Sequence, residues 1–295
     1  MHYNGPIVRP PMDGDSIFVE VTVGCTHNSC TFCNFYEGYP FRVAPLSQVE
    51  SDLKEASRYY RKGRSKVWAS GGNPFALSTQ KLIELGKLFR KYLPDCKIMT
   101  YARVDDMRRK SVEDIKSIID AGFHDIVIGV ESGDDKVLSS VNKGYDAEEI
   151  LEALGKLDQA GMKYRIIYLG GLAGKNKGEE SARVSADVIN QIHPHLMLLT
   201  MVDVLPGTTM YKQWKAGEFE PESELEKIKE YRELVANLNN HIVVQGQSAS
   251  SSLQFEAKLP EEKKELLKYL DQVINTFTDE DEKRISAMRA RMTRA

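Results

Sequence analysis

Two spacings of apolar residues alternate along the chain, and they predict short buried strands separated by amphipathic helices. Runs of consecutive apolar residues indicate strands, whereas apolar positions three and four apart, such as Leu82, Leu85 and Phe89, indicate the inner face of a helix. Strands are expected at about 17–24, 66–70, 97–101, 124–133, 163–169 and 195–202. Helices are expected at about 47–63, 79–92, 111–122, 147–160 and 179–192.

This alternation of strands and helices predicts the fold class. Six strand-then-helix units are typical of a parallel sheet with crossover helices, and strands that are apolar on both faces are typical of buried parallel strands. We therefore predict an α/β fold, a partial (β/α)6 TIM-like barrel, with a doubly wound sheet as the alternative. The loops after the strands form the active face of a barrel, and the polar and glycine-rich clusters of this chain all follow predicted strands.

The pattern changes near the ends of the chain, which suggests three parts. Residues 1–15 are an irregular lead-in, residues 16–215 are the barrel core, and residues 216–295 are a C-terminal helical extension that we expect to cover the barrel. Within the extension, the small polar stretch 245–256 is expected to be a mobile cover, with a plain surface linker as the alternative. Charged helices are expected at about 222–238, 259–277 and 280–294.

Composition and charge exclude some classes of partner. The chain has 295 residues, of which 41% are hydrophobic and 28% charged, and its formal net charge is −3. No apolar run reaches the roughly 20 residues that a membrane helix needs. We expect a cytoplasmic protein without a membrane partner, and we do not expect nucleic acid, although a tail helix with basic residues leaves that contact open. These tail residues are Lys283, Arg284, Arg289, Arg291 and Arg294.

Three of the four cysteines share one loop after the first predicted strand. Cys25, Cys30 and Cys33 are spaced as Cys-x4-Cys-x2-Cys, whereas Cys96 stands alone. Three thiolates on a short loop can bind one metal centre, and on a cubane 4Fe–4S cluster they leave one iron open. A zinc site with His27 as a fourth ligand is an alternative. A disulfide is not expected in a reducing compartment.

The thiol spacing, with Phe32 immediately before the last cysteine, resembles the motif of the radical SAM superfamily. The commonest form of that motif is Cys-x3-Cys-x-aromatic-Cys, so this chain has one extra residue in the first gap. The resemblance runs from about residue 16 to 215 and is to the anaerobic coproporphyrinogen oxidase-like and Elongator-type cores. It implies a 4Fe–4S cluster held by Cys25, Cys30 and Cys33, and S-adenosyl-L-methionine (SAM) as the second cofactor.

By the same resemblance, the methionine part of SAM is held by residues after the second and third strands and by one residue within the fifth. Gly71, Gly72 and Asn73 stand where the family has a glycine-rich turn that binds the methionine ammonium, with Asn73 in place of the commoner acid. Arg103 and Arg165 are the expected partners of the carboxylate, because guanidinium pairs bidentately with carboxylate. A surface arginine and a buried ion pair, respectively, remain the alternatives.

The nucleoside part of SAM is expected to meet a second group of residues. Glu131 and Ser132 resemble the family's Glu-Ser strand end near the ribose, although Ser132 could instead be a helix N-cap. The adenine is expected between Phe32 and the segments that follow strands five and six. These segments contain Gly170, Leu205 and Pro206.

The resemblance implies an oxygen-sensitive radical SAM enzyme. Such an enzyme cleaves SAM reductively at its 4Fe–4S cluster, and the resulting 5′-deoxyadenosyl radical abstracts hydrogen from a substrate that the sequence does not identify. Flavodoxin or ferredoxin is the expected electron donor, and the substrate is expected to be a small molecule. The sequence identifies no catalytic residue beyond the cluster and no reaction class. A non-catalytic iron–sulfur or heme carrier and a zinc-stabilised barrel enzyme are the alternatives.

Overall fold

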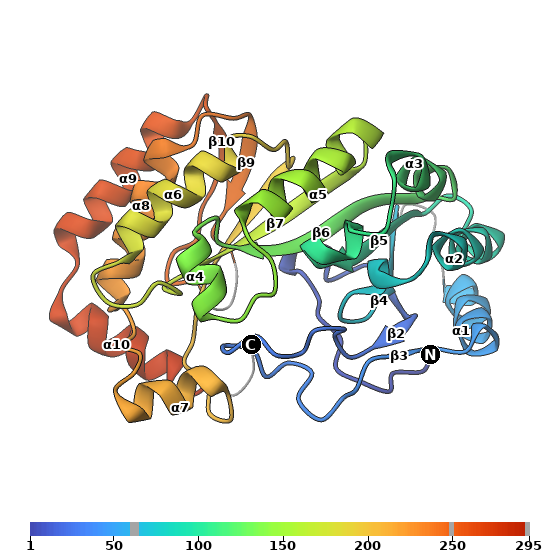
Figure 1. Cartoon of the computed structure of the whole chain (residues 1–295), viewed down its shortest axis with the longest axis horizontal. Helices are drawn as coiled ribbons and strands as arrows, with labels where there is room; N and C mark the ends of the chain where they lie inside the picture. Colours follow the sequence, from blue (N-terminus) through green and yellow to red (C-terminus); the bar gives the residue numbers. More distant parts are fainter. Residues whose placement is uncertain (60–64, 248–250, 293–295) are drawn as a thin grey trace. The chain divides into compact units, whose positions relative to one another are not determined.

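A mostly parallel sheet flanked by helices forms the framework of the protein (Figure 1). The computed structural model describes residues 1–59, 65–247 and 251–292. The eight-stranded sheet has the order β1-β4-β5-β6-β7-β8-β9-β10, and β2 and β3 form a second sheet. The strands are β1 Ile17–Glu20, β2 Thr22–Val23, β3 Arg42–Val43, β4 Lys66–Ser70, β5 Lys97–Ala102, β6 Phe123–Glu131, β7 Lys163–Gly170, β8 Leu196–Met201, β9 Ile242–Gln245 and β10 Glu256–Leu259.

Helices occupy most of the connections between these strands. The α-helices are α1 Leu46–Tyr59, α2 Thr79–Tyr92, α3 Val112–Asp120, α4 Asp135–Ser140, α5 Ala147–Ala160, α6 Gly178–Ile189, α7 Thr209–Ala216, α8 Glu224–Asn237, α9 Lys263–Thr276 and α10 Asp279–Arg289. Three 3-10 helices complete the elements: η1 Pro11–Asp13, η2 Pro74–Ala76 and η3 Val104–Met107. No helix of the described ranges is both long enough and apolar enough to cross a membrane.

The strand pairing confirms the predicted α/β class. β1 pairs parallel with β4, β4 with β5, β5 with β6, and β8 with β9. Central strands are buried on both faces: every residue of β4 after Lys66 and every residue of β5 after Lys97 is buried. Such strands are predominantly apolar, and this run of apolar residues is the sequence pattern that predicted them.

Two compact units divide the chain, and the division passes through β6 and β7. The first unit comprises Met1–Asn28, Tyr36–Gly129 and Glu152–Arg165. The second comprises Ser29–Phe35, Val130–Leu151 and Ile166–Ala295.

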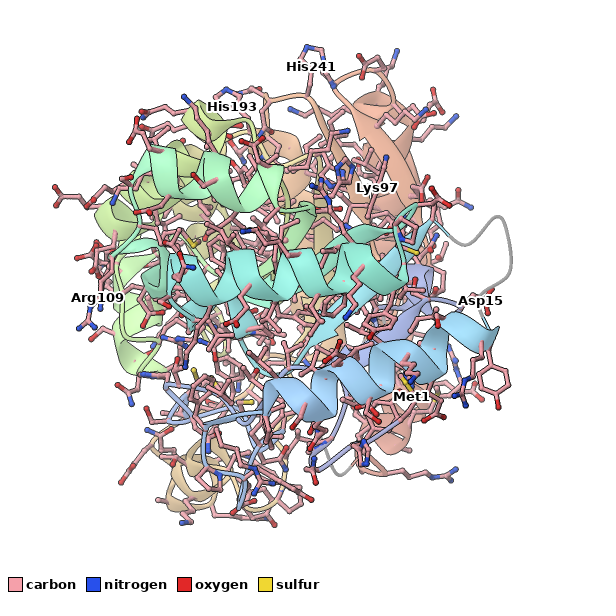
Figure 2. The ribbon with its side chains drawn as sticks, turned by 90° about the vertical axis from the view of Figure 1, so that its right-hand side faces the viewer. Met1, Asp15, Lys97, Arg109, His193 and His241 are labelled. Atoms are coloured by element: carbon pink, nitrogen blue, oxygen red, sulfur yellow. The ribbon has the colours of Figure 1, made fainter. Side chains whose placement is uncertain are left out.

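Aromatic side chains on adjacent strands form part of the core of the first unit. Phe18 of β1 stacks on Trp68 of β4 with ring centroids 5.6 Å apart. The rings of Trp68 and Tyr101 of β5 also contact each other, with centroids 4.6 Å apart. Aromatic pairs of this kind contribute about 0.5–1.5 kcal/mol beyond their buried area. The amino terminus of Met1 lies beside α1 (Figure 2) and pairs with Asp52 at 3.5 Å.

The second unit contains elements that the sequence analysis did not predict. α4 and α7 are short helices, and β9 and β10 lie within the C-terminal extension that was expected to be helical. β10 pairs antiparallel with β9, so the two strands extend the sheet beyond β8. Four-residue strands carry too little periodicity to be recognised beside charged helices.

Some sequence-based expectations concern residues outside the described ranges. These include residues 248–250 of the expected mobile cover, the helix end expected near Gly63, and Arg294 of the basic tail. Gln245 and Glu256, the two ends of the expected cover, lie instead in the paired strands β9 and β10.

Candidate functional site

The cysteine loop is divided between the two units. Cys25 belongs to the first unit and is half-buried, whereas Cys30 and Cys33 belong to the second, where Cys33 is exposed. The amide of Cys33 donates to the carbonyl of Cys30 at 3.2 Å, so these two residues share one tight turn. Cys96 is buried, as expected for a structural thiol.

Three accessible thiols fit an iron–sulfur cluster by their chemistry, because thiolates are the ligands such clusters require. None of the three cysteines of the loop is buried. Within the described residues, no three His, Cys, Asp or Glu side chains gather as a group that could hold a metal ion. A ligand role for the three thiols therefore rests on their chemistry and spacing.

The glycines after β4 allow close approach to the cysteine loop. A Cβ on Gly72 would lie 2.2 Å from the carbonyl oxygen of Gly24 and 3.0 Å from the Cα of Cys25. A Cβ on Gly71 would lie 2.0 Å from Oγ1 of Thr22. Only a residue without a side chain fits at these contacts, so the structure requires both glycines for packing against the loop that bears Cys25.

Asn73 joins the cysteine loop to η3. Its side chain is fully buried, its Oδ1 accepts from the amide of Thr26 at 3.0 Å, and its Nδ2 donates to Oγ1 of Thr26 at 2.7 Å. The same Nδ2 donates to Asp106 at 2.9 and 3.1 Å. Burial raises the pKa of Asp106 to about 7, although the hydrogen bond from the backbone amide of Arg103 acts to lower it.

Arg103 lies next to this network. Its side chain is buried, and its Nε donates to Asp105 at 2.8 Å, while its amide donates to Asp106 at 2.8 Å. The alternative of a surface arginine is therefore wrong for this residue. A contact of Arg103 with a cofactor carboxylate stays a prediction.

Arg165 meets two acids inside the first unit. Its Nε donates to Asp125 at 2.8 Å, its Nη1 donates to Asp13 at 2.6 Å, and all three side chains are buried. Burial disfavours the charge of Arg165, but the two carboxylates outweigh it and raise its pKa above the usual value. This arrangement is the buried ion pair that the sequence left as an alternative, and a role in cofactor binding stays a prediction.

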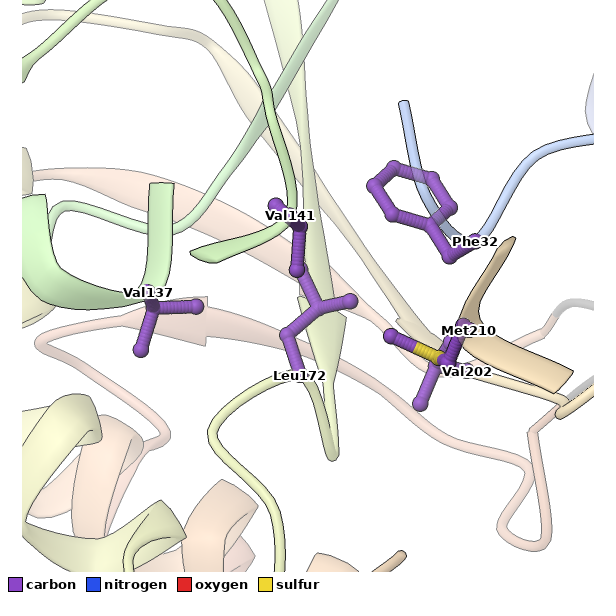
Figure 3. Close-up of a cluster of buried hydrophobic side chains, with 6 residues drawn as sticks. All are labelled: Phe32, Val137, Val141, Leu172, Val202 and Met210. Carbon is purple, nitrogen blue, oxygen red and sulfur yellow. The ribbon is translucent and has the colours of Figure 1, made fainter. Parts of the chain in front are cut away.

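Phe32 lies in an apolar cluster of the second unit. Its buried neighbours come from α4 and the turn after it, from the segments after β7 and β8, and from α7 (Figure 3). They are Val137, Val141, Leu172, Val202 and Met210. The backbone holds this segment from two sides, because Thr31 donates to the carbonyl of Val141 at 3.0 Å and accepts from the amide of Met210 at 2.7 Å.

A buried ion pair lies beside Phe32. Nζ of Lys143 is 3.0 Å from Oε1 of Glu131 and 5.7 Å from the ring centroids of Phe32 and Tyr145. Glu131 ends β6 with φ of 68°, a left-handed conformation that is uncommon for a side chain of this type. The pair therefore places a carboxylate and an ammonium next to the ring that lies between Cys30 and Cys33.

Ser132 and Gly170 have specific packing partners. The hydroxyl of Ser132 is 3.1 Å from that of Ser185 and accepts from the amide of Asp134 at 3.1 Å. Asp134 is the N-cap of α4, so the expectation that Ser132 could be a helix N-cap is wrong. A Cβ on Gly170 would lie 2.8 Å from the ring of Tyr231.

The segment after β8 reaches the cysteine loop within the second unit. Leu205 is buried, and its carbonyl accepts from the hydroxyl of Thr208 at 2.7 Å. The carbonyl of Pro206 accepts from the side chain of Asn34 at 3.4 Å. The structure thus brings Pro206 next to the residue that follows Cys33.

Two residues of these networks were not selected from the sequence. Asp106 follows Arg103 by three residues, and Lys143 lies in the stretch 142–144, which resembles the corresponding segment of the anaerobic coproporphyrinogen oxidase relatives. That resemblance assigned no role to Lys143, and the second of two aspartates carries no distinctive pattern. Only their burial, 5% exposed for Lys143 and 9% for Asp106, distinguishes them from surface charges.

Comparison with known proteins identifies sequence and fold relatives. The profile of the radical SAM superfamily matches residues 19–182, more than half of the 295 residues. Bacteriochlorophyllide d C-8(2)-methyltransferase of Chlorobaculum tepidum is 26% identical over 219 residues, which cover 70% of this chain and 46% of that enzyme. The chain thus spans about half the length of this curated relative.

Solved structures share the fold at low sequence identity. The Elp3 protein of Methanocaldococcus infernus superposes with a TM-score of 0.55 at 17% identity, over 87% of this chain and 63% of that one. Coproporphyrinogen III oxidase of Escherichia coli superposes with a TM-score of 0.54 at 21% identity, over 75% of this chain and 51% of that one. These likenesses show that the fold is the one predicted from the sequence.

Proposed function

Because the chain belongs to the radical SAM superfamily, whose members use a 4Fe–4S cluster and SAM in radical chemistry, we propose that it is an enzyme that abstracts hydrogen from a substrate still to be identified. When bound by the cysteine loop, the cluster would supply the electron for reductive cleavage of SAM to methionine and a 5′-deoxyadenosyl radical. The cysteine loop carries this proposal, since it lies within the matched residues 19–182. The zinc-site and carrier alternatives are not favoured by the family match.

Cys25, Cys30 and Cys33 are the proposed cluster ligands. Their accessibility and the shared turn of Cys30 and Cys33 support this assignment. Three protein thiolates leave the fourth iron for another ligand. The extra residue between Cys25 and Cys30 lengthens the loop but leaves the number of sulfur donors unchanged.

The residues of the first unit are proposed to hold the methionine part of SAM. The backbone of Gly71 and Gly72 presents polar groups without Cβ atoms, and Asn73 adds its own backbone groups, while the Asn73 side chain is occupied by internal hydrogen bonds. Arg103 supplies a guanidinium beside them. Arg165 is included only as a prediction, because Asp13 and Asp125 already neutralise its charge.

The residues of the second unit are proposed to hold the nucleoside. Glu131 and Ser132 supply acceptors at the end of β6, and Phe32 supplies an apolar face. Lys143 orients Glu131 through their ion pair. The segments after β7 and β8 complete this surface with Gly170, Leu205 and Pro206.

The C-terminal extension, residues 216–295, is proposed to cover the carboxyl ends of β7 and β8. Glu230 of α8 accepts from the amide of Gly171, directly after β7, and Nζ of Lys227 donates to the carbonyl of Val202, directly after β8, at 3.3 Å. Covering the strand ends excludes water, which a reactive radical requires. Flavodoxin or ferredoxin is the proposed electron donor, and the proposed substrate is a small molecule.

Release of 5′-deoxyadenosine tests this proposal. The full chain is reconstituted anaerobically with iron and sulfide, reduced with dithionite, and incubated with SAM. We expect 5′-deoxyadenosine and methionine in equal amounts, from the parent protein but not from Cys30→Ala. Cluster assembly without SAM cleavage would favour the carrier, and tight zinc without iron would favour the zinc site.

A further inference from the structure

The side-chain amide of Asn73 could occupy its site in either of two flipped orientations, and its neighbours select one. Asp106 receives hydrogen bonds from the amide of Arg103 at 2.8 Å and from Nδ2 of Asn73 at 2.9 Å. Above its pKa of about 7, and therefore at the pH of 8 used below, Asp106 is a carboxylate that only accepts, so Asn73 must face it with its NH₂ group. Its Oδ1 is then left to accept from the amide of Thr26 at 3.0 Å.

The orientation of Asn73 determines how the cysteine loop is held. The Thr26 amide is part of the peptide bond that joins Cys25 to Thr26, and Oγ1 of Thr26 accepts from the same Asn73 side chain at 2.7 Å. Thr26 is exposed whereas Asn73 is fully buried, so the two bonds tie an exposed loop residue to the interior. Gly72, packed on the Cα of Cys25, leaves this peptide little room to move.

We propose that Asp106 is a positioning residue for the thiol of Cys25: it fixes the orientation of Asn73, and Asn73 fixes the peptide bond after Cys25. Asp106, which belongs to η3, thereby positions the cysteine loop, although it lies 80 residues after Thr26 in the sequence. The proposal rests on the proposed function only in taking Cys25 as a cluster ligand. The hydrogen-bond chain itself can be tested without iron.

Limited alkylation of the apo protein measures directly how strongly Asp106 and Asn73 restrict the thiol of Cys25. The full chain is treated anaerobically with iodoacetamide at pH 8, and the rate at each cysteine is followed by peptide mass spectrometry. Asp106→Asn removes the acceptor-only partner and allows the Asn73 amide to flip. We expect the Cys25 rate to rise about three- to tenfold relative to Cys30 and Cys33, as expected for the loss of one or two hydrogen bonds.

An exchanged pair tests the directionality of the hydrogen bonds. In the double variant Asn73→Asp/Asp106→Asn, the carboxylate accepts from the amide and hydroxyl of Thr26, while the amide at position 106 donates to it and accepts from Arg103. We expect this variant to return the Cys25 rate to within about twofold of the parent, since the coupling is pairwise. Asn73→Asp alone sets two carboxylates against each other and should leave Cys25 reactive.

Two further variants test whether the effect on Cys25 comes from the lost hydrogen bonds, from the change in net charge, or from unfolding of the protein. Thr26→Ala alters only an exposed residue and keeps both Asn73 and Asp106, so it should raise the Cys25 rate even if Asp106→Asn fails to fold. Asp120→Asn makes the same charge change at an exposed position on α3 and should leave all rates at the parent value.

The proposal is overturned if Cys25 reacts at the parent rate in Asp106→Asn and Thr26→Ala, if all cysteines accelerate equally, or if the exchanged pair folds without restoring the rate. Iron content distinguishes these results from failure of the proposed function. Full iron in Cys30→Ala would refute the cluster ligands and leave the alkylation result intact. Loss of iron in Asp106→Asn, with iron restored in the exchanged pair, would support both.

Discussion

Cys30 and Cys33 lie in one hydrogen-bonded turn, and their thiols are the most direct test of the cluster assignment. Anaerobically reconstituted protein should hold about four irons per chain and show a broad visible band. Cys30→Ala should abolish both, because two thiolates do not retain the cluster. Iron analysis and the absorption spectrum measure the effect.

Cys96 provides the matched control for this substitution. It is buried just before β5, so Cys96→Ala should keep the full iron content. If Cys96→Ala lost the iron while Cys30→Ala kept it, the ligand assignment would be wrong.

Arg165 tests whether a buried charge serves stability or cofactor binding. Arg165→Met removes the guanidinium that pairs with buried Asp125 and Asp13, of which Asp13 keeps Lys66 at 2.8 Å, and it should lower the free energy of unfolding by about 3–5 kcal/mol. Urea denaturation of the apo protein at pH 7 measures the change. If pairing with these acids is the whole role of Arg165, affinity for SAM, measured on the folded holoprotein, should change little.

The opposite result would place Arg165 in the cofactor site. A direct contact with the cofactor carboxylate predicts an affinity lower by roughly ten- to a hundredfold in a variant of parental stability. Asp125→Asn is the matched partner variant, since it breaks the same ion pair from β6 and should destabilise the protein in the same way.

α8 joins the ends of two strands through buried acids. Glu230 accepts from the amide of Gly171 and the hydroxyl of Tyr168, each at 2.6 Å. Burial and the nearby carboxylates of Glu230 and Glu226 raise the pKa of Glu222, just before the helix, from 4.5 to about 9. The folded protein therefore keeps Glu222 protonated at neutral pH.

This raised pKa makes stability depend on pH. The unfolded chain releases the proton of Glu222 near its ordinary pKa, whereas the folded chain retains it up to about pH 9. The contribution of this acid to stability is therefore full below about pH 4 and is lost progressively as the pH rises to about 9. Glu222→Gln should flatten this decline and raise the melting temperature at pH 8, by about 2–4 °C for each kcal/mol regained.

Thermal melts of the parent and Glu222→Gln between pH 5 and 9 provide the measurement. Glu226→Gln is the control, because Glu226 completes the capping box of α8 with Ser223 and its pKa is lowered, so its removal should not flatten the decline. Parallel melting curves for the parent and Glu222→Gln would show that Glu222 is ionised in the folded state.

At the scale of the whole molecule, the end of the chain folds back onto the second unit through polar contacts. α10 has no buried residue, yet Arg289 donates to Glu224 at 2.6 Å and to Asp203, two residues after β8, at 2.7 Å. Glu282 accepts from the amide of Glu224 at 2.9 Å, at the start of α8. The helix is therefore held by charge rather than by apolar packing.

Arg289→Gln should release α10 and leave the rest of the fold intact. We expect hydrogen exchange in residues 279–292 to accelerate by at least about tenfold, because the side chains of this ion pair are only 3–11% exposed and truncating such a pair costs about 3–5 kcal/mol. Arg284→Gln, which breaks only an exposed contact with Asp281, should not change the exchange. Protection of α8 should persist in both variants, and its loss would show that α10 stabilises the whole unit.

The hydrophobic periodicity of the sequence was sufficient to predict the long helices and the buried strands. It predicted α2, α5 and β4 with their observed bounds, because helical spacing and uninterrupted apolar runs are local properties of the sequence. It missed α4, α7, β9 and β10, whose six, eight, four and four residues are too short for a clear period. β9 forms because β8 offers it a free edge, which no local pattern records.

The sequence by itself determined the α/β class, the cysteine loop and the family, since strand spacing, thiol count and glycine turns are written in consecutive residues. Only the tertiary structure decided which charges meet. Asp13, Asp125 and Arg165 are far apart in the chain, as are Thr26, Asn73 and Asp106, yet each trio forms one buried network. A buried charge needs a partner, and the fold determines which residue can reach it.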